Sequence, residues 1–574
     1  MATSSSARRA FFVALAIASL ALVARAHFGL EWFGDEANAI AEPMRYAMGD
    51  LPIVDSWHTQ FSSGLLLTPV VRLLMAIYPD GSGLMIGFRV VYVMMQVASA
   101  LAVWWLLRRT ISGWAAGAIA VTVFWYAPYY YVFPYYNNIA IVALLVSSLA
   151  VYTAFTVEGR ADTRLLLLAG VAFAVGVIVY PTMLAMLPFT VVGVLVHARC
   201  RIGSNVSVSS PILLFLGVVF GVLLLYAVTV FAIASQGQLL ASLPNFLHPI
   251  DRDMSAGALV ARFTRTKAVL GAAVVCLITL VVGLVLARRT RISSPVAVSA
   301  AMVAGCLFAL MAPYLRHALL YYMDIQQSAM LALALIVPVL MVLRSDELVR
   351  AAFWLLTVPA FGAAAGTAVV SYEGFETATM PMVIGAVATL VVLFQWAGQR
   401  AASSSGHAAQ IAAFVATASV FVVLAGTTLA LTGGDDVVWR LNTTIDTGPY
   451  KSIRTSARGA QRYSRYMALL TPLAKTGGRI AFVGEFPIGY VLTGSRPGTY
   501  SIWTTFPSGS LWQEYLSITG NHPSTIVSTR FVGPNGGRVA SPFVPPFGLS
   551  DFDDRYDETY RDDEFVIYQG RFGQ

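Results

Sequence analysis

The sequence predicts an α-helical polytopic membrane protein with a small C-terminal mixed α/β domain. Of its 574 residues, 57% are hydrophobic and 11% are charged, and the mean hydropathy is +0.71. Soluble globular chains carry about 25% charged residues, so this composition excludes that class. Residues 110–157 contain no Asp, Glu, Lys or Arg, and one helical span takes roughly 20 residues. The apolar runs are too long for barrel strands, so helices are expected.

Polar breaks divide the apolar sequence into about 13 spans. They lie near residues 10–26, 84–107, 114–133, 138–156, 165–180, 182–197, 211–234, 268–287, 295–313, 326–343, 350–370, 380–397 and 410–431. Alternation from a cytoplasmic N-terminus gathers the basic clusters on one side, as the positive-inside tendency requires. The net charge of +8 then reflects cytoplasmic anchoring more than nucleic-acid binding. Residues 8–26 also fit a cleaved signal peptide, which is the alternative to a retained first span.

The tail, residues 432–574, replaces Val-Leu-Ala runs with Asp, Arg, Gly, Pro and Tyr. We therefore expect a transmembrane domain over 1–431 and a soluble extracytoplasmic domain after it. Within the tail, the patterns predict a helix over 452–475 and strands at 479–483, 526–531 and 565–568. The acidic segment 551–564 is expected to be a solvated face, with calcium binding as the alternative.

The first outer loop, residues 27–64, concentrates the polar chemistry. Asp35 and Glu36 follow the first span by about ten residues, and a base at the water boundary suits transfer from a lipid-borne substrate. We expect a short amphipathic helix over 35–48 at the membrane interface, ended by Gly49. Successive helical residues point about 100° apart, so the two carboxylates address different atoms. Helix capping by Asp35 is the structural alternative to catalysis.

The layout of the chain resembles the C superfamily of integral-membrane glycosyltransferases, which use lipid-linked sugars. This family includes protein O-mannosyltransferases, aminoarabinose transferases and mycobacterial arabinosyltransferases, and the resemblance covers most of the chain. It rests on the order of short motifs rather than on any one of them. The motifs are Asp35-Glu36 after one span, Gly49-Asp50-Leu51-Pro52, Gln60-Phe61-Ser62-Ser63-Gly64 leading into Pro69, Gly87-Phe88-Arg89 opening the second span, and a soluble tail after the last span.

The resemblance implies an inverting hexosyl- or pentosyltransferase of the plasma (inner) membrane. It would move a sugar from a polyprenyl-phosphate carrier to an extracytoplasmic glycan, lipid or protein. Asp35 matches the family's loop carboxylate and would be the general base, while Glu36 orients a second group. The proposed catalytic pair is therefore Asp35 and Glu36.

Polar residues in two outer loops are candidates for substrate binding. The family carries a second acid at the outer start of a later span, where this chain has two asparagines instead. Asn can hydrogen-bond to sugar hydroxyls but cannot act as a base, and capping of the following helix is the alternative. The candidate substrate contacts are Asn137, Asn138, Asp55, His58 and Gln60.

The expelled lipid phosphate needs cations, because its charge develops where solvation is poor. The preferred pair lies in the outer connection 314–324, a second group precedes the span at 268–287, and a last arginine lies one turn into the second span. These residues are Arg316 and His317; Arg262, Arg265 and Lys267; and Arg89. Anionic headgroups are the alternative partner of the second group, and Glu36 is the alternative partner of Arg89.

Three questions stay open at the level of sequence. The paired acids leave room for a divalent metal near the phosphate, although no separate metal motif is visible. A transporter or flippase of lipid-linked intermediates is one rival function, but we find no internal repeat or paired broken helices. A non-catalytic glycan-binding membrane protein is the other. The 34 Arg against 3 Lys hint at a GC-rich bacterial source.

Overall fold

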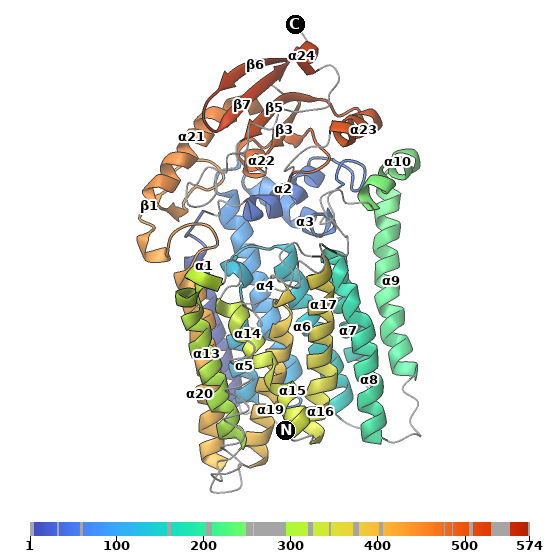
Figure 1. The fold of residues 1–574 in the computed structure, drawn as a ribbon, viewed down its shortest axis with the longest axis vertical. Coiled ribbons are helices and arrows are strands. Elements are labelled where there is room, and N and C mark those ends of the chain that lie inside the picture. Colours follow the sequence, from blue (N-terminus) through green and yellow to red (C-terminus); the bar gives the residue numbers. More distant parts are fainter. Residues whose placement is uncertain are drawn as a thin grey trace.

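The chain is an α-helical multi-pass membrane protein with a small C-terminal sheet region, as the composition predicted. The computed structural model describes residues 5–30, 34–57, 61–157, 162–202, 209–247, 257, 294–319, 325–343, 346–370, 378–400, 406–475, 477–484, 486–503, 509–529 and 552–571. Figure 1 shows a long helical bundle with the sheet region at one end and the N-terminus at the other.

Within the described residues, nine helical segments are long and apolar enough to cross a membrane. They are formed by α1 (Ser5–Arg25), α4 (Leu84–Leu107), α6 (Tyr136–Thr156), η2 with α8 (Pro181–Ala185, Met186–Ile202), α9 (Ser209–Ile233), α14 with α15 (Ile325–Ala334, Ile336–Leu343), α16, η3 and α17 (Glu347–Ala352, Phe353–Thr357, Val358–Val370), α19 (Met382–Gln399) and α20 (Gly406–Ala430). Four shorter apolar stretches lie in α3 (Phe61–Ile77), α5 (Gly113–Phe124), α7 (Thr163–Val179) and α13 (Ser294–Leu319). The expected span at 268–287 lies outside the described residues.

Small residues let neighbouring helices of the bundle approach closely. A Cβ on Gly193 of α8 would lie 2.0 Å from the Trp354 carbonyl oxygen, and one on Gly176 of α7 would lie 2.9 Å from the Leu144 side chain. Close backbone approach of this kind is how helices associate in lipid, where apolar burial gives no driving force between them.

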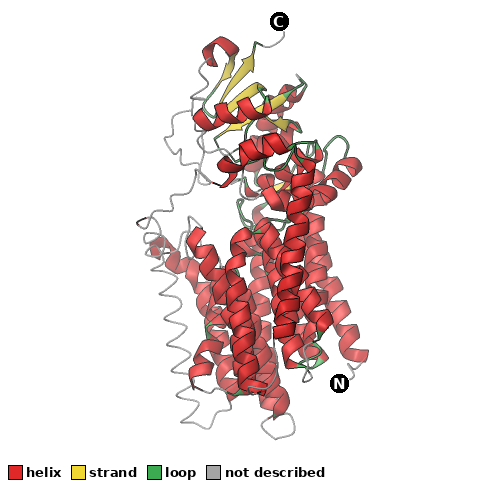
Figure 2. Ribbon diagram, turned by 90° about the vertical axis from the view of Figure 1, so that its right-hand side faces the viewer, coloured by secondary structure: helices red, strands yellow, loops and turns green. Residues whose placement is uncertain are grey.

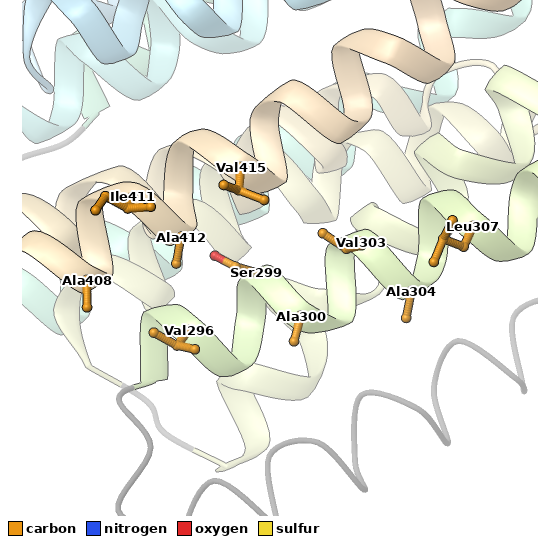
Figure 3. A pocket seen from close by; sticks show the side chains of 10 residues that line it. All are labelled: Val296, Ser299, Ala300, Val303, Ala304, Leu307, Ala408, Ile411, Ala412 and Val415. Atoms are coloured by element: carbon orange, nitrogen blue, oxygen red, sulfur yellow. The ribbon is translucent and has the colours of Figure 1, made fainter.

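An apolar groove of the bundle lies between α13 and α20 (Figure 3). It has a volume of about 690 Å³, and Ile411 is 64% exposed there. Its lining comes from residues 296–307 and 408–415, which are the beginnings of their helices. Since α20 ends beside the sheet region, the groove belongs to the opposite half of the bundle.

Two expectations for the first 135 residues were wrong. The apolar sequence from 61 to 77 forms α3, where we expected only a connection. The span expected over 114–133 stops as α5 at Phe124. Pro128 and Pro134 cannot donate to a helical ladder, and Tyr129 and Tyr130 adopt left-handed backbone angles with φ of 58° and 62°. Residues 125–135 are therefore an irregular loop, in which η1 (Pro128–Tyr130) is a single turn.

The C-terminal sheet has five strands in the order β4-β3-β5-β7-β6, and Figure 2 shows it at the end of the molecule that carries the C-terminus. β3 pairs in parallel with β4 and β5, and β7 pairs antiparallel with β5 and β6. The strands are β3 (Arg479–Val483), β4 (Arg496–Pro497), β5 (Pro523–Thr529), β6 (Tyr556–Arg561) and β7 (Phe565–Gly570), with a separate pair β1 (Thr443–Thr444) and β2 (Arg454–Thr455). The helices around them are η4 (Val438–Arg440), α21 (Ala457–Ala474), α22 (Ile488–Thr493), α23 (Gly509–Thr519) and α24 (Phe552–Arg555).

The expected helix and three expected strands of the tail correspond to α21, β3, β5 and β7. Residues 556–561 of the acidic segment form strand β6, and every residue of this strand after Tyr556 is exposed, as expected for a solvated face.

Helix α2 (Asp35–Ala47) is held between the bundle and the sheet region. It contacts α3 on one side and α22 on the other, and α10 (Gln236–Leu247) contacts α23 nearby. One apolar cluster runs from Ile40 of α2 through Phe88 of α4 to Phe482 of β3. We expected α2 to lie on the membrane surface with one apolar face, but nearly all of its residues are buried.

Candidate active site

Asp35 is the first residue of α2 and accepts hydrogen bonds from two tyrosines of the irregular loop. The Tyr131 hydroxyl donates to Oδ2 at 2.5 Å, and the Tyr135 hydroxyl donates to Oδ1 at 2.9 Å. The residue in the capping position is Gly34, so the capping alternative for Asp35 is wrong. Asp35 is half-buried, and an ionised carboxylate offers about four acceptor sites. The two tyrosine bonds hold the carboxylate in a fixed orientation.

The two tyrosines act as hydrogen-bond donors rather than as acids. Burial, and then the charge of Asp35, raise the pKa of Tyr135 well above its ordinary value, so its proton stays in place at neutral pH. Tyr131 stacks on Phe133 at a ring-centroid distance of 4.9 Å and meets Tyr135 edge to face at 6.0 Å. Aromatic packing therefore fixes both hydroxyls before substrate arrives.

Polar side chains deep in the bundle hold the start of this loop. Gln326 of α14 is fully buried, and its Oε1 accepts the Ala127 N–H at 2.8 Å. Thr428 of α20 donates to the Trp125 carbonyl at 2.9 Å. The backbone that leaves α5 thus finds partners in the bundle, which a buried irregular segment requires.

Glu36 points to the other side of α2 and forms a buried ion pair with Arg89. Arg89 Nε and Nη2 donate to the two Glu36 oxygens at 2.5 and 2.7 Å. The same guanidinium donates to the carbonyls of Ala26, Phe28 and Gly29. These five bonds match the five N–H donors of arginine.

Arg89 therefore ties the loop after α1 to α2, and the expectation that it binds the donor phosphate is wrong. The alternative pairing with Glu36 is the one that forms. Both Glu36 oxygens take part in this ion pair, and a catalytic role for Glu36 stays a prediction.

Arg25, at the end of α1, is a buried residue that the sequence analysis missed. It donates to the carbonyls of Phe28, Thr428 and Leu431, so it joins the ends of α1 and α20. Together with Arg89 it lines a small polar pocket that also contains Glu36. The signal was an arginine at the very end of an apolar run, which entered the prediction only within the alternative of a cleaved signal peptide.

The two asparagines lie in the first turn of α6, and both are buried. Asn138 donates to the carbonyls of Tyr131 and Phe133 at 3.3 and 3.1 Å, so it fixes the loop that bears the tyrosines. The capping position belongs to Tyr135, without a side-chain bond, and the capping alternative is wrong for both. Asn137 Oδ1 is buried without a hydrogen bond among the described residues.

Asp55 belongs to a buried network that joins the α2 loop to the sheet region. Arg45 is fully buried and donates to Asp50 at 3.1 Å, and Asp50 pairs with Arg479 of β3 at 2.8 Å. One Asp55 oxygen accepts the Asn521 amide and the other a backbone N–H, both at 2.5 Å. Burial, followed by the charge of Asp50, raises the pKa of Asp55. Each Asp55 oxygen thus has a partner within the protein, and contact between Asp55 and substrate stays a prediction.

The remaining candidates are not placed by the structure. His58, Gln60, Arg262, Arg265 and Lys267 lie outside the described residues. Arg316 and His317 fall in the last turn of α13, which continues six residues beyond the expected span, but their side chains are also outside the description. Within the described residues, no group of three His, Cys, Asp or Glu could hold a metal ion.

The comparisons with known proteins give distant likenesses only. No protein-family model and no curated protein sequence matches the chain. Among solved structures, it is similar to the oligosaccharyltransferase AglB from Archaeoglobus fulgidus, in complex with an inhibitory peptide and a dolichol-phosphate. That likeness has a TM-score of 0.45 and 12% identity, over 92% of this chain and 70% of that one.

A second similar structure is ArnT from Cupriavidus metallidurans bound to undecaprenyl phosphate. Its TM-score is 0.39 with 12% identity, over 99% of this chain and 98% of that one. Because both likenesses are distant, the geometry of this chain's own residues carries the proposal below.

Proposed function

We propose that this protein is an inverting glycosyltransferase that moves a sugar from a polyprenyl-phosphate carrier to an extracytoplasmic acceptor. The observation that carries this proposal is the setting of Asp35. Its carboxylate is half-buried at the junction of membrane helices and sheet region, and two tyrosines orient it. A general base must reach the acceptor hydroxyl within hydrogen-bond distance, and such positioning is typically worth about 10²- to 10⁴-fold.

In the proposed step, the acceptor hydroxyl attacks the anomeric carbon of the carrier-bound sugar. Asp35 takes the hydroxyl proton while the new C–O bond forms. The bond between the anomeric carbon and the phosphate oxygen breaks on the opposite face, and polyprenyl phosphate leaves with the electron pair. Attack from the face opposite the leaving group inverts the anomeric configuration. The cations that stabilise the leaving phosphate are proposed to be Arg316 and His317, with Arg262, Arg265 and Lys267 as further candidates.

The proposed orientation places the sheet region outside the plasma (inner) membrane. Phe11 near the start of α1 stacks on Trp104 near the end of α4, at 4.8 Å, so Arg8 and Arg109 belong to the same end of the bundle. That end is opposite the sheet region (Figure 1). Basic residues gathered at one end favour the cytoplasmic side, which leaves Asp35 at the other surface. We propose 1–431 as the transmembrane domain and 432–574 as the extracytoplasmic domain.

The test uses the full-length protein in lipid nanodiscs. Radiolabelled polyprenyl-phosphate hexoses and pentoses are supplied one at a time with a detergent extract of bacterial envelope as acceptor. Release of polyprenyl phosphate is measured, and the wild type is expected to turn over at least one donor. Asp35→Asn is expected to lose at least 100-fold in rate with an unchanged melting temperature. Normal turnover by that variant, or lipid flipping without release, would refute the proposal.

A further inference from the structure

A second polar pocket lies along α2, beyond Asp35. Asn38, Ala39 and Glu42 line it from the helix, and Tyr135 and Tyr136 line it from the irregular loop. Residues three, four and seven positions apart share a helix face, so this lining continues the face that carries Asp35. The helical rise of 1.5 Å per residue puts Asn38 about 4.5 Å and Glu42 about 10 Å along the axis from Asp35.

Two acceptors on this face of α2 have fewer hydrogen bonds than they could take. Glu42 Oε1 accepts from the Tyr46 and Ser56 hydroxyls at 2.6 Å each, whereas Oε2 is buried without a hydrogen bond among the described residues and lies 3.9 Å from Arg45 Nη1. Pro43 lies inside α2 and has no N–H, so the Ala39 carbonyl lacks its helical donor.

Asn38 is the second polar side chain of α2 in this pocket. Its side chain is 5% exposed, and no hydrogen bond joins its amide to the part of the chain that the structure describes. Buried polar groups in native proteins are almost always paired. Asn38 and Ala39 line this pocket on the face of Asp35, and their amide and carbonyl groups point to a ligand that supplies their partners.

The size of the pocket restricts that ligand. The accessible volume is about 10 Å³, and a single water needs about 10–15 Å³. A whole sugar ring cannot enter, whereas one hydroxyl substituent fits. The Tyr135 hydroxyl proton is committed to Asp35, so an entering hydroxyl can donate to the Ala39 carbonyl and accept from the Asn38 amide.

We propose that this pocket is a specificity site that receives one hydroxyl of the carrier-bound sugar, with Asn38 and the Ala39 carbonyl as its partners. The proposal rests on the proposed function, because the sugar must stand beside Asp35 for one of its hydroxyls to reach the next turn of α2. Pro43 then has a use: it interrupts the helical ladder at the residue whose carbonyl faces the substrate.

The test compares two proline substitutions in full-length protein that also carries Asp35→Asn to prevent turnover. Pro43→Ala returns a helical donor to the Ala39 carbonyl. Pro69→Ala is the matched control, because it does the same for Leu65 in α3. Both should raise the melting temperature. Binding is measured with undecaprenyl phosphate mannose, glucose and arabinose, each against bare undecaprenyl phosphate, to give the affinity gained from the sugar.

For at least one sugar, Pro43→Ala and Asn38→Ala are expected to reduce that gain three- to tenfold, the worth of one hydrogen bond, while Pro69→Ala leaves it unchanged. In the protein without these substitutions, one monodeoxy form of that sugar should lose the same factor, and in Pro43→Ala this loss should disappear. A gain that all three variants retain would show that the pocket holds only a water molecule. If no sugar adds affinity in the Asp35→Asn protein, the proposal that this pocket binds a sugar hydroxyl is also refuted.

The outcomes separate this inference from the proposed function. If Pro43→Ala lowers the sugar-dependent affinity while the wild-type protein releases no polyprenyl phosphate from any donor, the specificity site is supported and the transferase function is refuted. If the wild type turns over a donor but every variant keeps the same sugar-dependent affinity, the transferase function is supported and the specificity site is refuted.

Discussion

Arg89 and Glu36 form a two-point ion pair that is almost completely removed from solvent, with side-chain exposures of 5% and 0%. The pair fixes the first turn of α2 against α4, one residue from the carboxylate that we propose as the base. Removal of one partner leaves a buried charge without its counterion, which typically costs about 3–5 kcal/mol.

Glu36→Gln is therefore expected to lower the stability of the protein far more than a surface substitution would, and to reduce turnover because Asp35 loses its support. The double variant Glu36→Gln/Arg89→Gln should recover part of the stability, since no unpaired charge remains. Thermal unfolding in detergent, followed by tryptophan fluorescence, measures both. Equal losses in the single and double variants would contradict the pairing.

Removal of the hydroxyl of Tyr135 or Tyr131 is expected to impair catalysis while the fold survives. Tyr135→Phe keeps the ring packing but removes one hydrogen bond to the ionised form of Asp35. Because such bonds favour the ionised form, the acid limb of the pH–rate profile should move to higher pH, with a fall in kcat of about tenfold. Tyr490→Phe, which alters a buried hydroxyl of the sheet region, is the control. A pH–rate profile identical to that of the wild type would show that the tyrosines have no role in the active site.

The stability of the protein should rise as the pH falls from neutral toward the ordinary aspartate value of about 3.9, to the extent that Asp55 contributes. Burial and Asp50 raise the pKa of Asp55 in the folded state, so folded protein binds the proton more readily than unfolded chain. The stabilisation begins as the pH drops through the raised pKa and is complete below the unfolded value. Melting temperatures of wild type and Asp55→Asn across this range check the sign. The pH-dependent difference between them should shrink as the pH falls, and an increasing difference would contradict the assignment.

Gly34→Ala tests how α2 is seated against the sheet region. Gly34 has φ of 84°, and an added Cβ would lie 2.9 Å from Pro487 and 3.2 Å from Trp503. We expect a loss of stability of about 1–3 kcal/mol from backbone strain and a larger loss of turnover. Gly81→Ala is the matched control, since its φ is 72° but nothing lies within 4 Å of the added atom. Similar turnover in both variants would show that the contact with Pro487 is unimportant.

Local patterns in the sequence predicted much of the fold. Helix α2 appears where the spacing of Ile40, Met44, Ala47 and Met48 predicts it, and strand β3 appears where the run 479–483 does, because their signals lie within a few residues. The residues that hydrogen-bond to Asp35 could not be predicted from such local patterns. Tyr131 and Tyr135 lie 96 and 100 positions further along the chain, and Tyr131 fell inside the expected span 114–133. The aromatic run between Pro128 and Pro134 was the available signal that this stretch is not a span.

The apolar cluster that joins Ile40, Phe88 and Phe482 means that the last 143 residues are not a detachable module. Cutting the chain after Leu431 would expose the side of the sheet region that packs against α2. It would also expose Asp35 to solvent. Attempts to study glycan recognition with a soluble fragment would then probe an unfolded or aggregating peptide. Assays of this protein need the whole polypeptide in a bilayer.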